Sequence, residues 1–150
     1  MQLQDDISTV HPEDYTRVVE VWEASVRATH HFVSESDIEF FRPLVYNELP
    51  SVKLGCVRDE NGMVVGFIGT SQRKIEMLFI HPAWRGQGVG RRLLRYAVDE
   101  DEATILDVNE QNEQALGFYL RMGFEVIGRS EDDGQGKPYP LLHMRLAKIK

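Results

Sequence analysis

The chain has 150 residues, the length of one compact domain, and its 42% hydrophobic and 27% charged residues are ordinary for a globular protein. Acidic residues outnumber basic ones by 24 to 17, so the net charge of -7 argues against nucleic acid as the main partner and suits a cationic one. No apolar run is long enough to span a bilayer, and the N-terminus has no signal-peptide pattern. We therefore expect a single domain over residues 1–150, in the cytoplasm and without membrane contact. The single cysteine, Cys56, agrees with a reducing compartment.

The first third of the chain indicates two helices. Residues 2–8 predict a short strand. Apolar residues then recur at helical spacing from Pro12 to Val26, which predicts an amphipathic helix with His30 near its end. A packed, hydrogen-bonded His30 is the alternative to a functional one. Ser34 to Asp37 has the spacing of a capping box and predicts a second helix, which we expect Pro43 to interrupt.

Three strands are expected next. Val52 to Arg58 and Met63 to Thr70 alternate in polarity and flank an Asn-Gly pair, which predicts a hairpin. Ile75 to Ile80 is apolar at almost every position, as in a strand covered on both faces. Glu76 is the exception, because a buried carboxylate is costly unless it is paired, hydrated or used for chemistry. The alternative is a solvated carboxylate near Arg73 and Lys74.

A glycine-rich stretch, Arg85 to Gly90, separates this strand from an amphipathic helix over Val89 to Val98. Alternating glycines allow backbone amides to converge on one oxyanion, and the N-terminal end of the helix adds partial positive charge. No carboxylate lies between Glu76 and Asp99, whereas four arginines do. The stretch therefore predicts an anion-binding loop.

Two common nucleotide-binding motifs do not fit this stretch. A P-loop needs Lys followed by Ser or Thr after its last glycine, and Arg91-Arg92 stands there instead. A dinucleotide fingerprint needs glycine at the sixth position, where Arg91 or Leu93 is found.

The last third of the chain alternates strands and a helix. Thr104 to Val108 predicts a strand, and Phe124 to Gly128 and Leu141 to Leu146 predict two more. Between the first two, a helix carries one apolar face and ends at Gly123. A polar loop over residues 130–140 contains three consecutive acids. The full order of elements describes a mixed α/β domain.

Two motifs together resemble the GCN5-related N-acetyltransferases (GNAT). Arg-x-x-Gly-x-Gly from Arg85 to Gly90 is similar to their pyrophosphate loop, and Phe118-Tyr119 followed by Gly123-Phe124 is similar to a motif of their second half. The sequences at residues 28–32 and 136–140 are similar to small single-domain bacterial members. The resemblance implies a central mixed sheet flanked by helices. It also implies direct transfer of an acetyl group from acetyl-CoA to a primary amine in a ternary complex, with no metal.

The resemblance also implies a set of coenzyme A contacts. Backbone amides of Gln87 to Gly90 would hold the pyrophosphate, the strand near Leu78 would offer an N–H to the thioester oxygen, and Asn109 would bind the pantetheine arm. The complete set of cofactor-binding residues is Leu78, Phe79, Ile80, Arg85, Gly86, Gln87, Gly88, Val89, Gly90, Arg91, Asn109, Ala115, Phe118 and Tyr119.

Three residues are candidates for proton transfer. An alkyl ammonium has a pKa of about 10.4, so roughly one molecule in a thousand is nucleophilic at neutral pH and a base is useful. Glu76, acting through water, is the first candidate base and His30 the second. Tyr119 is the candidate acid for the departing thiolate, although its position on a helix face also suits a core aromatic residue.

The acceptor is open at this stage. The resemblance places it near Trp22, His30, Phe32 and Phe41, with the acidic loop opposite, which favours a cationic amine. A protein lysine or N-terminus, a polyamine, an aminoglycoside and an amino-acid-like metabolite all remain possible, as do a monomer and a homodimer. A non-catalytic acyl-CoA sensor is the alternative function, and a nucleotide-binding protein is disfavoured by the motifs.

Overall fold

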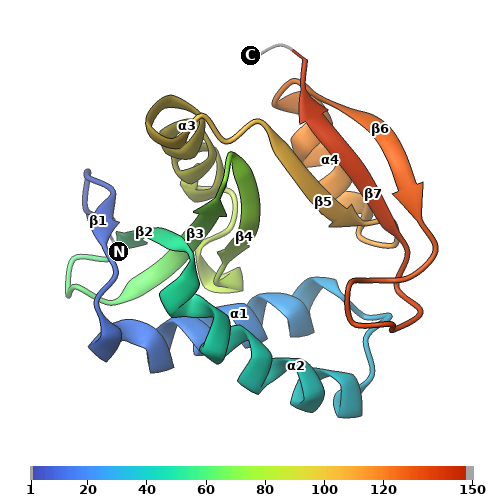
Figure 1. Ribbon diagram of the computed structural model, residues 1–150. Coiled ribbons are helices and arrows are strands. Elements are labelled where there is room, and N and C mark those ends of the chain that lie inside the picture. The colour runs from blue at the N-terminus through green and yellow to red at the C-terminus, as the bar shows by residue number, and fades with distance from the viewer. Residues whose placement is uncertain (1, 148–150) are drawn as a thin grey trace. The chain divides into compact units, whose positions relative to one another are not determined.

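A computed structural model describes residues 2–147 (Figure 1). The chain forms two compact units, Met1–Ala103 and Thr104–Lys150, and each is described by itself. The prediction of a single domain over the whole chain stays a prediction. No helix among the described residues is long and apolar enough to cross a membrane.

The described residues of the first unit, 2–103, form four strands, three α-helices and three short 3-10 turns. The strands pair in the order β1-β2-β3-β4, each antiparallel to the next. In chain order the elements are β1 (Ser8–Thr9), η1 (Pro12–Asp14), α1 (Tyr15–Thr29), α2 (Glu35–Glu48), η2 (Leu49–Ser51), β2 (Lys53–Arg58), β3 (Val64–Ser71), β4 (Lys74–Ile80), η3 (Pro82–Trp84) and α3 (Val89–Asp101). The predicted strand over residues 2–8 is thus displaced, because β1 covers only its end and the following residue.

The second helix differs from the prediction. Ser34 caps α2 as expected, because its Oγ accepts a hydrogen bond from the backbone N–H of Asp37 at 3.1 Å. Pro43, however, lies inside α2, and the helix continues to Glu48. Phe41 and Val45, on either side of the proline, pack against the core of the unit. This packing outweighs the single backbone hydrogen bond that a proline removes, so the helix is not interrupted.

The core of the first unit lies around β3. Seven of its eight residues are buried, because α1 and α3 both pack on this strand. Val18, Val21, Trp22 and Phe67 are among the buried residues of the core cluster. The stripe predicted for α1 is therefore confirmed as its buried face.

Close packing positions the start of α3. A Cβ at Gly66 on β3 would lie 2.7 Å from Cγ1 of Val89, the first residue of α3, which is closer than real contacts allow. Glycine at this position therefore lets the helix start, and the loop before it, approach the sheet. Val89, Leu93, Leu94 and Ala97 form the buried face of α3, as predicted.

In the second unit, residues 104–147 are described and form three strands and one α-helix. The elements are β5 (Ile105–Asn109), α4 (Glu113–Arg121), β6 (Phe124–Ser130) and β7 (Leu141–Leu146), and the strands pair antiparallel in the order β5-β7-β6. Asn112 caps α4, since its Oδ1 accepts from the N–H of Ala115 at 3.2 Å. Gly123 follows the helix with φ 100°, the left-handed conformation expected at this position.

Candidate active site

The glycine-rich loop has the backbone that an anion-binding loop requires. Gly86 and Gly88 take φ values of 76° and 80°, which lie in the left-handed region that favours glycine. A Cβ built on either residue would have no atom within 4 Å, so conformation and not crowding demands glycine. Gly88 is the N-cap residue of the 13-residue helix α3. The loop thus presents backbone amides beside open space at the positive end of a helix.

The arginines near this loop do not act as one group. The Nη2 atom of Arg92 donates to the carbonyl oxygens of Gln4 and Asp5, at 2.9 and 2.5 Å. Arg92 therefore fastens the N-terminal segment to α3. Arg91, by contrast, is exposed and directly follows Gly90, the last residue of the glycine-rich stretch.

His30 lies at the end of α1, where the backbone N–H of His30 donates to Val26. Its pKa is lowered to about 4, first by burial and then by the positive charges of Arg85 and His31. The imidazole is therefore neutral at neutral pH and lies within electrostatic reach of Arg85, the first residue of the glycine-rich stretch.

The tautomer of His30 follows from its neighbour. The hydroxyl of Thr29 donates its proton to the carbonyl of Ser25 at 2.7 Å, and the same oxygen lies 2.7 Å from Nδ1 of His30. Since the hydroxyl proton is already used, Nδ1 must donate and Nε2 carries the lone pair. The lone pair belongs to a weakly basic ring, because its pKa is about 4.

The other residues expected near the acceptor have different surroundings. Trp22 is 5% exposed and belongs to the core cluster, against which Phe41 also packs. Phe32 is half-buried, and its ring centroid lies 5.2 Å from that of His30. The structure thus brings Phe32 and His30 together and gives Trp22 a role in the core.

Glu76 is not a buried carboxylate. Its side chain is 27% exposed, and the carboxylate lies 3.7 Å from Nζ of Lys74 on the same strand. It also raises the pKa of Glu48, for which burial is the larger cause. The solvated alternative considered for Glu76 describes its position better than enclosure among apolar residues. Leu78, Phe79 and Ile80, further along β4, are half-buried.

Tyr119 is 8% exposed in the second unit. Its ring packs edge-on against Phe118 and Phe124, with centroids at 5.3 and 5.8 Å. Burial raises the pKa of the phenol, which is therefore protonated at neutral pH. Asn109 ends β5, and its carbonyl accepts from the N–H of Asn112 at 3.0 Å, which links the strand to the cap of α4.

The acids of the loop between β6 and β7 have separate roles. Oδ1 of Asp133 accepts from the N–H groups of Gln135 and Lys137 at 2.8 and 2.9 Å, so this carboxylate organises the loop. Glu131 pairs with Arg129 at 2.6 Å. Asp132 is exposed. Of the three acids, Asp132 is the one best placed to attract a cation from solvent.

A hydrogen-bonded chain in the second unit was not predicted. His143 on β7 lies between Asp107 on β5 and Ser130 on β6, with Nδ1 2.5 Å from Oδ1 of Asp107 and Nε2 2.7 Å from Oγ of Ser130. The three residues are far apart in the sequence, and only strand pairing brings them together. The sole sequence signal is that each is a polar residue in or beside a predicted strand.

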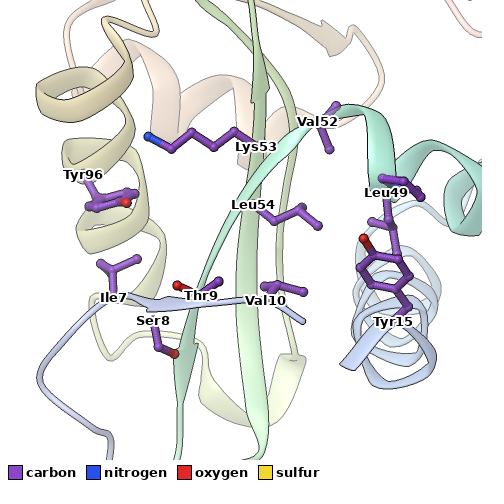
Figure 2. A pocket seen from close by; sticks show the side chains of 11 residues that line it. Ile7, Ser8, Thr9, Val10, Tyr15, Leu49, Val52, Lys53, Leu54 and Tyr96 are labelled. Atoms are coloured by element: carbon purple, nitrogen blue, oxygen red, sulfur yellow. The ribbon is translucent and has the colours of Figure 1, made fainter. Parts of the chain in front are cut away.

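One pocket of the first unit has a volume of 310 Å³ and lies beside β1 (Figure 2). Its walls come from the N-terminal segment, α1, η2, β2 and α3, and Lys53 and Tyr96 line it on the α3 side. Nζ of Lys53 pairs with the carboxylate of Asp101. None of the residues predicted to bind the cofactor or the acceptor lines this pocket. Among the described residues, no group of three or more His, Cys, Asp or Glu is placed to hold a metal ion.

Comparisons with known proteins agree with these features. The family model described as an acetyltransferase (GNAT) domain matches residues 29–148. The peptidyl-lysine N-acetyltransferase YjaB of Escherichia coli (strain K12) is 44% identical over 132 residues, which cover 88% of this chain and 90% of that protein. The solution structure of apo-form YjaB from Escherichia coli matches with a TM-score of 0.89 and 40% identity, over 99% of this chain and 100% of that one.

A more distant solved structure shows the fold with its ligand. The PaiA N-acetyltransferase from Thermoplasma acidophilum, in complex with coenzyme A, matches with a TM-score of 0.73 and 20% identity, over 97% of this chain and 99% of that one. These matches confirm the predicted fold class, a central mixed sheet flanked by helices.

Proposed function

Because the chain belongs to the acetyltransferase (GNAT) family, and is therefore an N-acetyltransferase that uses acetyl-CoA, we propose that its acceptor is the side-chain amine of protein lysines. Relatives that are 44% and 41% identical over 88% of this chain are named peptidyl-lysine N-acetyltransferases, in Escherichia coli and Salmonella typhimurium. The acidic balance of the chain suits a cationic acceptor. The reaction is then direct transfer within a ternary complex of acetyl-CoA, enzyme and lysine.

The glycine-rich loop carries this proposal for the cofactor. The left-handed Gly86 and Gly88, with open space beside them at the start of α3, support pyrophosphate binding by the amides of residues 87–90. Arg85 and the exposed Arg91 add positive charge. The N–H groups of β4 near Leu78 serve the thioester oxygen, and Asn109 binds the pantetheine arm. When bound, acetyl-CoA supplies the activated acyl group.

Tyr119 is the acid of the proposed reaction. Its buried phenol is protonated at neutral pH and therefore has a proton to give to the thiolate as the C–S bond breaks. The two residues first considered as the base, Glu76 and His30, are less well supported. Glu76 is partly exposed beside Lys74, and the His30 ring is weakly basic with a pKa of about 4.

The proposal also covers the cellular compartment of the enzyme, its partners and its oligomeric state. Cys56, the one cysteine of the sequence, is buried and unpaired, which suits a reducing compartment and supports the cytoplasm of a bacterium, where acetyl-CoA is available. The proposal includes no nucleic acid partner and no membrane partner. It holds equally for a monomer and for a homodimer.

The test is coenzyme A release from acetyl-CoA, measured as free thiol, with lysine peptides, N-terminal peptides, polyamines, aminoglycosides and amino acids as acceptors. We expect turnover with lysine peptides above all other classes, and mass spectrometry should place the acetyl group on the lysine Nζ. Turnover confined to a small amine would contradict the lysine assignment. Calorimetric titration with coenzyme A checks cofactor binding separately, and binding without turnover on any amine would instead support an acyl-CoA sensor.

A further inference from the structure

Ser130, His143 and Asp107 form a continuous hydrogen-bonded chain whose direction is fixed by chemistry. The carboxylate of Asp107 only accepts, so Nδ1 of His143 must donate to it across 2.5 Å. In the neutral imidazole the other ring nitrogen, Nε2, then carries the lone pair and accepts the hydroxyl proton of Ser130 across 2.7 Å. A group that gives a proton to Oγ of Ser130 can thus pass one on to His143, and the Asp107 carboxylate stabilises the imidazolium that forms.

Strand register puts the three side chains on one face of the β5-β7-β6 sheet. Asp107 is directly opposite His143 in the β5–β7 pair, and cross-strand partners share a face. Leu106 and Met144, the neighbouring pair, are buried on the other face, the face that α4 covers. The chain therefore lies on the face of this sheet that α4 leaves uncovered.

A β-bulge in β6 places the side chain of Ser130 on the same face of the sheet as His143. Val126 pairs with Met144, but Gly128 and not Ile127 pairs with His143, so one residue is inserted into the strand. Side chains alternate between faces, and without the bulge residue 129 would stand on the His143 face in place of Ser130. A Cβ at Gly128 would lie 3.4 Å from Cδ2 of His143, so glycine leaves the ring edge uncovered.

The surroundings of the chain suit a cationic amine. Ser130 is the last residue of β6, and the acidic loop that follows it includes the exposed Asp132. The side chains of His143 and Asp107 are 34% and 26% exposed, so the group is accessible to solvent and to a ligand. Further along the same face, Glu125 and Arg145 neutralise each other in an ion pair at 2.9 Å.

We propose that Ser130, His143 and Asp107 are the proton relay that deprotonates the acceptor amine, a role that rests on the proposed lysine acetylation. The ammonium gives one proton to Oγ of Ser130, whose own proton moves to Nε2 of His143 and from there to solvent. The nitrogen then forms the C–N bond with the acetyl carbon as the C–S bond breaks. The second proton lost by the nitrogen replaces the one that Tyr119 gives to the thiolate. Asp107 is the positioning residue, because it acts only through the imidazole.

The test compares kcat and KM for a lysine peptide in variants of the full chain. His143→Ala should lower kcat about 10²-fold, the usual scale of general base catalysis, with KM and coenzyme A affinity changed less than about twofold. Added imidazole should restore part of the lost rate. Ser130→Ala should lower kcat, whereas Ser130→Thr keeps the hydroxyl and should retain activity. Asp107→Asn, which no longer holds the required tautomer, should lower kcat and leave KM unchanged.

Each outcome decides between the relay and its alternatives. A His143→Ala variant as active as the wild type would overturn the relay and leave the acetyltransferase assignment intact. The relay is also overturned if lost activity coincides with a lowered Tm and imidazole restores none of it, because the hydrogen-bonded chain would then have a structural role. A wild-type enzyme that binds coenzyme A and acetylates no amine would refute the proposed function, and the relay with it.

Discussion

Tyr119 is buried and its phenol is protonated at neutral pH, which gives the first prediction at the scale of single residues. Tyr119→Phe removes the phenolic proton and keeps the aromatic contacts with Phe118 and Phe124. We expect kcat for the lysine peptide to fall about 10²-fold or more, with coenzyme A affinity and Tm nearly unchanged. The control is Tyr46→Phe, because Tyr46 is an exposed tyrosine of α2. Equal activity of the two variants would remove Tyr119 from the mechanism.

His30 gives a prediction about stability and pH. Its pKa is about 4 in the folded protein, below the ordinary value of 6.5, so the unfolded chain binds more protons between these values. The contribution of His30 to the free energy of unfolding is therefore complete above pH 6.5 and decreases as pH falls toward 4. Its upper limit is about 3 kcal/mol.

Denaturant unfolding at several pH values measures this contribution. His30→Gln should lose less stability than the wild type when the pH falls from 6.5 to about 4. His11→Gln changes an exposed histidine that is not among the causes of the His30 pKa shift and is the control. Parallel pH curves for wild type and His30→Gln would show that burial of this ring does not govern its titration.

At the scale of elements, glycine substitutions can separate two properties of the glycine-rich loop. One is its left-handed backbone, and the other is its proposed binding of coenzyme A. Gly88→Ala keeps every side-chain contact, because nothing lies within 4 Å of the new Cβ, but it strains a residue at φ 80° by about 1–2 kcal/mol. We expect a lower Tm and weaker coenzyme A binding in calorimetry. Gly136→Ala is the matched control, since Gly136 has φ 74° and equally open space in the loop of the second unit. Similar coenzyme A affinities in both variants would contradict pyrophosphate binding by this loop.

The contact between β3 and α3 gives a second prediction for an element. Gly66→Ala places a Cβ 2.7 Å from Val89, and either the helix start or the strand must move. Overpacking of this kind usually costs about 1–3 kcal/mol, so we expect a lower free energy of unfolding together with weaker coenzyme A binding. Gly134→Ala, with no neighbour within 4 Å, should change stability by less than about 0.5 kcal/mol. Unchanged cofactor binding in Gly66→Ala would show that the loop adjusts independently of the strand.

At the scale of the whole molecule, the net charge of -7 should attract cationic acceptors. We expect kcat/KM for a lysine peptide flanked by arginines to exceed that for the same peptide flanked by aspartates. The difference should shrink as salt is raised from about 50 to 500 mM, because the Debye length falls well below 10 Å. A preference that does not depend on salt would indicate specific contacts in place of long-range attraction.

Much of this protein follows from its sequence, because the relevant signals are local. Helical periodicity, the Ser34 cap, the Asn-Gly turn and Gly123 each act over a few residues, so the order of elements is correct. The glycine-rich loop is equally local, since left-handed glycines and the following helix start are adjacent in the chain. These short-range requirements predicted the order of elements and a mixed α/β domain, whereas the expected cofactor came from the resemblance of two motifs to the acetyltransferase family.

Only the tertiary structure decided the features that depend on distant residues. Pro43 stays inside α2 because packing against the core compensates for a lost hydrogen bond. Glu76 is partly exposed because its side chain reaches solvent beside Lys74 on β4. The chain of Asp107, His143 and Ser130 depends on strand order and on a one-residue bulge, neither of which leaves a local signature. The sequence by itself determined the order of elements and the position of the glycine-rich loop. Side-chain partnerships across strands required the folded chain, because a shift of one residue in register turns every side chain to the opposite face.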